Sequence, residues 1–222
     1  MTKNVADIRK DLKAKLDNKE FVIDKTGVKT IELLGVSFIA DEPFIFRETN
    51  EDYVKREIEW YQSMSLYVED IPGETPQIWN DVSSKHGRIN SNYGYLCAHP
   101  DNGSQFMQCV DTLCKDLNSR RAMMIYTRPS IQTDYNTDGM SDFICTNAVQ
   151  YIVRENRVNA IVQMRSNDAV FGYNNDFAFQ KYMLDEVVKS LNERYNGMLS
   201  AGDITWQVGS MHCYSRHFKF VK

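Results

Sequence analysis

Two segments are the most informative part of the sequence: Asp142-Phe143-Ile144-Cys145-Thr146-Asn147-Ala148-Val149-Gln150-Tyr151 and, further on, Arg165-Ser166-Asn167-Asp168. Bulky side chains fall mainly on the odd positions of residues 143–153, which is the period of a β-strand, and residues 158–164 alternate again. The polar residues 154–157 lie between the two segments. The sequence therefore predicts a β-hairpin with Cys145 on the bulky face of its first strand.

The hairpin would bring a candidate nucleophile close to a candidate anion site. A cationic side chain beside a half-buried thiol lowers its pKa below about 8.5 and supplies thiolate at neutral pH. Cys145 is the predicted nucleophile, and Arg165 would provide the positive charge. The competing interpretation is a small buried cysteine that only fills space in the core.

Composition limits the class of protein. A chain of 222 residues with 42% hydrophobic and 25% charged residues is predicted to form a single globular domain over residues 1–222. The net charge of −4 argues against direct nucleic-acid binding. The N-terminus lacks a signal-peptide core, and no apolar run could cross a membrane. Five cysteines without a regular framework favour reduced thiols, so a cytoplasmic location is expected.

The pattern along the chain predicts both kinds of secondary structure. Helices are expected at residues 5–16, 50–64 and 101–117, and a long helix from Phe177 is expected to end near Gly197. Further strands are expected at 21–23, 30–40, 122–126, 204–214 and 217–221. Residues 122–126 would be a buried strand. Helices and strands do not alternate strictly. This order favours an α+β fold with a large mixed sheet flanked by helices.

Three polar groups could bind a nucleotide-like ligand. Arg120 and Arg121 could clamp a phosphate, although a solvated strand end is the alternative. Residues 25–27 resemble a phosphate-binding turn but lack the full P-loop pattern. His212 and Tyr214 share one face of a predicted strand and could hydrogen-bond a sugar, or could be two polar groups with hydrogen-bond partners in the core.

Two further clusters could face a cavity or hold a metal. Glu57 and Trp60 lie one helical turn apart and could face one cavity, but Glu57 could instead be an exposed ion-pair partner. Cys97, His99, Cys109 and Cys114 have a spacing that fits no common zinc signature, so no metal is predicted.

Taken together, the motifs resemble thymidylate synthase and, more closely, the deoxycytidylate hydroxymethylases of T4-like bacteriophages. The resemblance runs from about residue 21 to the C-terminus. Besides residues 142–151 and 165–168, the matching segments are DKTGVKT (24–30), DEPFIF (41–46), DIPGETP (70–76), NSNYG (90–94), SRR (119–121), IYTRPS (125–130) and GSMHCYSRH (209–217). The order and spacing of these motifs favour a catalytic Cys145 over a packing cysteine.

The resemblance implies a thymidylate synthase-like fold and a one-carbon transfer from 5,10-methylenetetrahydrofolate, without a metal. Cys145 would add to C6 of the pyrimidine, and Glu57 would organise water and proton transfer. Arg165 and Ser166 would hold the 5′-phosphate with Lys25 nearby. The further residues with implied roles are Arg120 and Arg121 reaching that phosphate from the partner subunit of a homodimer, His212 and Tyr214 on the deoxyribose, Tyr93 near Cys145, and Trp79 and Asp168 on the folate.

Asp176 is the departure from thymidylate synthase that bears on the substrate. It stands where that enzyme carries a uracil-reading asparagine. A carboxyl group can accept from cytosine N4 and share a proton with N3, so Asp176 favours dCMP over dUMP. The alternative role of Asp176 is a helix N-cap ahead of Phe177.

The resulting hypothesis is a dimeric enzyme that converts dCMP, the folate and water to 5-hydroxymethyl-dCMP and tetrahydrofolate. Two alternatives remain: methylation with dihydrofolate as product, and a weakly catalytic interaction module among phage nucleotide-synthesis enzymes. For a phage protein, the expected location is the host cytoplasm. Relatives carry a further C-terminal segment that helps cover the folate, whereas this chain ends shortly after His217.

Overall fold

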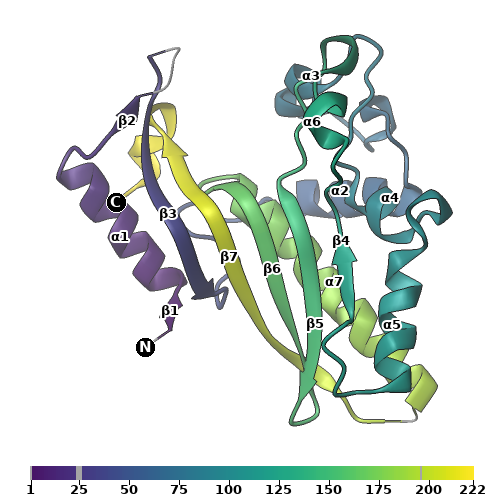
Figure 1. The fold of residues 1–222 in the computed structure, drawn as a ribbon. Helices are drawn as coiled ribbons and strands as arrows, with labels where there is room; N and C mark the ends of the chain where they lie inside the picture. The colour runs from purple at the N-terminus through teal and green to yellow at the C-terminus, as the bar shows by residue number, and fades with distance from the viewer. Residues whose placement is uncertain (1, 24–26, 196) are drawn as a thin grey trace.

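The computed structural model describes residues 2–23, 27–195 and 197–222. Its centre is a mixed sheet in which the described strands follow the order β1-β3-β7-β6-β5-β4, with β2 paired to β3 (Figure 1). The strands are β1 (Lys3–Asn4), β2 (Val22–Ile23), β3 (Lys29–Ile39), β4 (Met123–Ile125), β5 (Thr146–Arg154), β6 (Arg157–Asp168) and β7 (Ser200–Tyr214). β6 and β7 are parallel, whereas β3–β7, β5–β6 and β4–β5 are antiparallel. The predicted α+β class and mixed sheet are confirmed.

The predicted hairpin is formed by β5 and β6. Arg154 pairs with Arg157, and Glu155 and Asn156 form the turn with φ values of 51° and 60°. Two consecutive left-handed residues match the twist of the strands that they join. The polar break read from the sequence is therefore the turn itself.

Helices cover the sheet and carry several of the predicted site residues. They are α1 (Val5–Asp17), α2 (Glu51–Ser63), α3 (Gln77–Val82), α4 (Tyr93–Ala98), α5 (Gln105–Lys115), α6 (Ile131–Asp134) and α7 (Gly172–Tyr195). α7 crosses behind β5 and β6, α5 lies beyond it, and α1 lies along β3 at the other end of the sheet (Figure 1). α7 also links the parallel strands β6 and β7, which need such a crossover connection. Among the described helices, none is long and apolar enough to cross a membrane.

The buried face of the sheet changes partway along the strands. On β6 the buried positions are even-numbered up to Met164 and then pass to Asn167. On β7 they are even-numbered up to Val208 and then pass to Met211. Met164 pairs with Val208 and Asn167 with Met211, so the two strands change together. After the pair Met164–Val208, the buried position of β6 is the polar Asn167 and no longer an aliphatic residue.

The same change of buried face corrects the prediction for the first strand of the hairpin. β5 has a register shift between Thr146 and Ala148, and its buried positions change from even to odd directly after Ala148. A bulge of this kind breaks the two-residue period. Cys145 therefore does not share a continuous face with Val149 and Tyr151, as the alternation suggested.

Two other predicted strands differ in the structure. Residues 217–221 were expected to be a strand, but Ser215–Phe220 forms a 3-10 helix. The short strand β4 was expected to be buried, yet only Met124 is buried, while Met123 and Ile125 are exposed. β4 lies at the edge of the sheet, which explains why alternate side chains face solvent.

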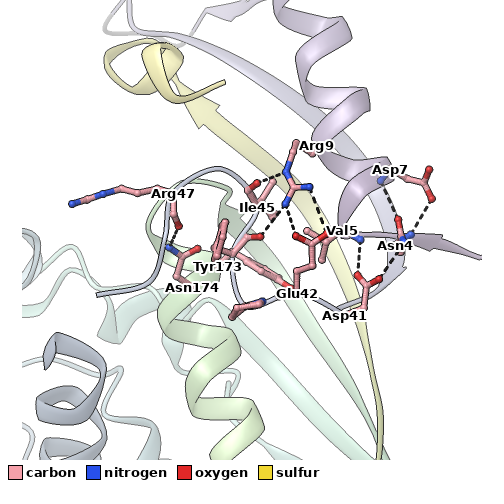
Figure 2. Close-up of polar contacts among 12 residues, drawn as sticks. Asn4, Val5, Asp7, Arg9, Asp41, Glu42, Ile45, Arg47, Tyr173 and Asn174 are labelled. Carbon is pink, nitrogen blue, oxygen red and sulfur yellow. Dashed lines mark hydrogen bonds and ion pairs between the residues drawn. The ribbon is translucent and has the colours of Figure 1, made fainter. Parts of the chain in front are cut away.

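The loop between β3 and α2 is hydrogen-bonded to α1 and to the start of α7 (Figure 2). From α1, Arg9 donates to the carbonyl of Ile45 at 2.6 Å and pairs with Glu42 at 2.8 Å. From α7, the Tyr173 hydroxyl donates to the Glu42 carbonyl at 2.9 Å, and Asn174 donates to the Arg47 carbonyl at 2.7 Å. These bonds hold the segment before α2 against α7. Glu57 lies on α2 and Asp176 on α7, and both are predicted site residues.

Candidate active site

Cys145 lies directly before β5, with its thiol beside the guanidinium of Arg165. The Arg165 Nη2–Cys145 Sγ distance is 3.4 Å, and the backbone N–H of Arg165 donates to the Cys145 carbonyl at 2.9 Å. Arg165 also donates to the carbonyls of Phe143 and Ile144, at 2.6 and 3.0 Å. The hairpin therefore brings the predicted nucleophile and the predicted cation together, as the sequence suggested.

The thiol is a weaker acid than the sequence suggested. Burial raises the pKa of Cys145 to about 11, although the charge of Arg165 lowers it, and the carboxyl groups of Asp176 and Asp142 add to the increase. The expectation that the neighbouring cation would give a lowered pKa is wrong, because burial outweighs it. At neutral pH, Cys145 is a thiol in this pocket.

Asp176 lies within α7 and approaches Cys145 closely enough to raise its pKa. Asn167 Nδ2 donates to Asp176 Oδ2 at 2.7 Å. Burial raises the pKa of Asp176 to about 8, the charge of Glu57 raises it further, and hydrogen bonds from Asn167 and Tyr93 lower it. The alternative of a helix N-cap is wrong, because α7 begins at Gly172 and Asp176 is inside its first turns.

Glu57 is the second carboxyl group of the pocket, with 5% of its surface exposed. The hydroxyl of Tyr53 donates to Glu57 Oε1 at 2.5 Å and accepts from Trp79 Nε1 at 2.8 Å. Burial raises the pKa of Glu57 to about 7, against the hydrogen bonds of Tyr53 and Trp79. The alternative of an exposed ion-pair partner is wrong. Trp60 is fully buried and packs edge-on against Trp79 at 5.2 Å.

Tyr93 joins the two sides of the pocket from α4. Its ring stacks on Tyr61 of α2 at 5.4 Å, and burial raises its pKa, with further increases from Asp176 and Cys145. The next residue, Gly94, allows this contact: a Cβ there would lie 1.7 Å from the Tyr61 carbonyl oxygen. The glycine after Tyr93 is thus required for the close approach of α4 to α2.

The residues predicted to hold the sugar and part of the phosphate meet on β6 and β7. Asp168 pairs with His212 and Ser166 with Ser210, so these side chains come from neighbouring rungs. The rings of His212 and Tyr214 lie edge-to-face at 4.9 Å. Asp168 Oδ1 accepts from the backbone N–H of Val170 at 3.0 Å, and its side chain is 20% exposed. The roles of these residues in binding remain predictions.

The two arginines predicted to clamp a phosphate lie far from Cys145 in the structure. Arg120 and Arg121 are exposed before β4. The backbone N–H of Tyr151 donates to the Ala122 carbonyl at 2.8 Å, which places the pair opposite the far part of β5, about 20 Å along the strand from Cys145. Lys25 lies outside the described residues. Within the described residues, no three His, Cys, Asp or Glu side chains are grouped so as to hold a metal ion.

Comparisons with known proteins identify the family. The sequence model of the thymidylate synthase family matches residues 10–222. The chain belongs to the thymidylate synthase family. Deoxycytidylate 5-hydroxymethyltransferases of Enterobacteria phages T4 and T6 are 57% identical to it over 98% of this chain and 89% of their own length. A thymidylate synthase of Francisella tularensis subsp. holarctica is 21% identical over 89% of this chain and 76% of its own length.

Two residues of this thymidylate synthase family pocket were not assigned a role from the sequence. Tyr53 bridges Glu57 and Trp79, and its only sequence signal is the four-residue spacing to Glu57 on one helix. Asn167 stood inside a quoted motif without a function. Its signal is a polar side chain on the buried face of a strand, at 3% exposure, where a partner is required.

Proposed function

We propose that this chain transfers the one-carbon unit of 5,10-methylenetetrahydrofolate to C5 of dCMP, with water, giving 5-hydroxymethyl-dCMP and tetrahydrofolate. The observation that carries the proposal is the buried carboxyl group of Asp176, which lies close enough to the Cys145 thiol to raise its pKa. Its pKa of about 8 keeps a proton available at neutral pH. The names of the relatives at 57% identity support the same reaction.

Cytosine and a protonated carboxyl group are complementary. Cytosine presents an acceptor at N3 and a donor at N4, and a neutral Asp176 offers a hydroxyl donor and a carbonyl acceptor. In the reaction, Cys145 Sγ forms a bond to C6 as its proton leaves to water. The electrons of the C5=C6 bond are drawn toward C5 and N3, and N3 takes up the proton of Asp176. C5 thereby becomes nucleophilic, which is the purpose of covalent catalysis here.

Glu57 is suited to the later proton transfers because its pKa of about 7 lies near the operating pH. Once the new carbon–carbon bond has formed, C5 loses its hydrogen as a proton to water, and the electron pair of that C–H bond releases tetrahydrofolate by breaking the bond between the transferred carbon and nitrogen. A water oxygen then bonds to the exocyclic carbon, and Glu57 accepts the proton that this water loses. N3 returns its proton to Asp176 as Cys145 Sγ leaves C6 with the bonding pair, which restores the C5=C6 bond and releases the enzyme.

The residues proposed for the folate fit such a group. The partly buried indole of Trp79 is held by Tyr53 beside Glu57 and offers a flat apolar surface for a pterin ring. The partly exposed carboxylate of Asp168 can accept hydrogen bonds from ring N–H groups. When bound, the folate supplies a carbon at the oxidation level of formaldehyde.

The phosphate site is proposed to be shared in a homodimer. Arg165 and Ser166 would bind the 5′-phosphate from the chain that carries Cys145, with Lys25 near them. Arg120 and Arg121 would come from the partner subunit, since in their own chain they lie far from Cys145. His212 and Tyr214 would bind the deoxyribose hydroxyl, and Tyr93 would line the base pocket.

Product analysis tests this function directly. Incubation with dCMP and the folate should yield a nucleotide heavier than dCMP by a hydroxymethyl group in place of hydrogen, with tetrahydrofolate as the second product. Absorbance should show no accumulation of dihydrofolate. A methylated nucleotide with matching dihydrofolate would replace the proposal with methylation, and no turnover of any pyrimidine nucleotide would favour an interaction module.

A further inference from the structure

A chain of hydrogen bonds runs through the core from Trp206 to Asp176. The indole Nε1 of Trp206 on β7 donates to Asn167 Oδ1 on β6 at 3.2 Å, and Asn167 Nδ2 donates to Asp176 Oδ2 on α7 at 2.7 Å. Trp206 is fully buried, and Asn167 is 3% exposed. These two bonds link β7 through β6 to a carboxyl oxygen of α7.

The direction of each bond follows from the chemistry of the groups. An indole N–H can only donate, so the amide must turn its carbonyl oxygen toward Trp206. The amide nitrogen then faces Asp176 and can also only donate. Oδ2 of Asp176 accepts this bond, and a carbonyl oxygen is a better acceptor than a hydroxyl oxygen. The bond therefore favours the proton of the carboxyl group on Oδ1.

This asymmetry matters because a free carboxylic acid can bind either base. With its proton opposite N3 and its carbonyl oxygen opposite the exocyclic group, it binds cytosine. With its proton opposite the exocyclic group and its carbonyl oxygen opposite N3, it binds uracil, which presents an N3 donor and an O4 acceptor. A carboxyl group in the pocket therefore does not discriminate between the bases unless something fixes which oxygen carries the proton.

We propose that Trp206 and Asn167 are specificity-determining residues that hold Oδ2 of Asp176 as an acceptor opposite the exocyclic group, so that the pocket binds cytosine and rejects uracil. This inference rests on the proposed base-reading role of Asp176. Oδ2 retains a second lone pair for the N4 amine, while Oδ1 carries the proton toward N3. Uracil would place O4 against an oxygen that has no proton to give.

The test compares dCMP and dUMP in Asn167→Leu and Trp206→Phe. Asn167→Leu removes the donor to Oδ2 with little change in size, so the preference for dCMP in kcat/KM should fall at least tenfold. The ratio of the Kd values for the two nucleotides, measured by calorimetry without folate, should shift in the same direction. Trp206→Phe frees the amide to rotate, which lets Oδ2 carry the proton and Oδ1 accept from uracil N3–H. It should lower the preference by a smaller factor.

Two controls separate loss of the hydrogen-bond chain Trp206–Asn167–Asp176, here called the relay, from a general loss of activity or stability. Tyr182→Phe removes a hydrogen bond between α7 and Gln62 of α2 without touching Asp176 and should leave the ratio unchanged. In an Asp176→Ala background, which leaves no group for Asn167 to orient, Asn167→Leu should cause no further change in the ratio. If Asn167→Leu fails to fold in a thermal melt, Trp206→Phe still tests the relay.

The possible failures can be distinguished. If Asp176→Ala abolishes the preference but Asn167→Leu and Trp206→Phe lower activity on both nucleotides equally, the proposed hydrogen-bond chain is wrong and Asp176 keeps its role. If Asp176→Ala leaves the preference unchanged, the base-reading role of Asp176 is wrong and the role of the chain is wrong with it.

Discussion

Asp176 is hydrogen-bonded to a buried partner of its own chain, whereas Arg120 and Arg121 are exposed and lie about 20 Å along the sheet from Cys145. The base side of the pocket is also the side where burial raises the pKa values of Asp176, Glu57 and Cys145. Its protonation states are therefore fixed when one chain folds. Of the residues proposed to bind the phosphate, Arg165 lies beside Cys145 and Ser166 follows it on β6.

This contrast separates two kinds of defect. Loss of a group on the base side should change chemistry or base choice and should not be rescued by another subunit with a defect on the same side. Loss of a proposed partner arginine should weaken phosphate binding, and another subunit should be able to supply it. The predictions below test that division.

The largest effect is expected from Cys145→Ser. A serine hydroxyl is far less acidic than a thiol and a poorer nucleophile, so turnover of dCMP should fall at least about a thousandfold. Binding of dCMP should be retained, because the bonds of Arg165 to the Phe143 and Ile144 carbonyls do not involve the thiol. Steady-state turnover and calorimetric binding measure the two quantities.

Cys114→Ser is the matched control, since Cys114 is a partly exposed thiol of α5 outside the pocket. It should keep nearly full activity. Substantial turnover by Cys145→Ser would return Cys145 to a packing role and remove the basis of the proposed mechanism.

The next effect concerns the shared phosphate site. Arg165→Ala and Arg120→Ala should each lose about a hundredfold or more in kcat/KM, because charge-assisted bonds to phosphate are lost. After subunit exchange, half of a random mixture is heterodimer with one intact site, so about a quarter of wild-type activity should return. Activity is measured before and after exchange, with dimer exchange verified separately.

A mixture of Arg165→Ala with Cys145→Ser gives the sharpest control for this experiment. Both residues belong to one chain's part of the site, 3.4 Å apart, so no heterodimer can contain an intact site. This mixture should stay inactive. Recovery in both mixtures, or in neither, would contradict the proposed division between subunits.

The sequence predicted secondary structure better than it predicted the burial and the packing neighbours of individual residues. The hairpin of β5 and β6 was predicted because alternation and turn residues are local signals. The face of Cys145 was not, because the register shift in β5 belongs to a change of buried face that β6 and β7 share. Residues 217–221 have the aromatic content of a strand, but Phe218 stacks on Phe21 at 5.7 Å within a 3-10 segment. Tertiary packing decided both positions.

The site shows the same limit. The family resemblance correctly grouped Cys145 with Arg165 and Asp176, and the structure brings these residues together. Sequence reasoning gave the wrong direction for the pKa of Cys145, because charge neighbours can be read from motifs but the depth of burial cannot. Asn167 was overlooked for a related reason: its function depends on Trp206, which is distant in sequence.

The smallest effect is a change in how stability depends on pH. Burial raises the folded-state pKa of Glu57 from 4.5 to about 7, so the folded protein binds a proton there more tightly than the unfolded chain does. The stability from this group is fully present below the unfolded pKa and is lost as the pH rises toward about 7. The wild-type free energy of unfolding should therefore fall between about pH 5 and pH 8. Glu57→Gln should reduce that fall by roughly 1–3 kcal/mol. Denaturant titrations at matched protein concentration measure it, and Glu59→Gln on the exposed face of the same helix is the control. An equal pH dependence in Glu57→Gln and wild type would mean that Glu57 is ionised in the folded pocket, and its assignment as a proton acceptor near neutral pH would have to be abandoned.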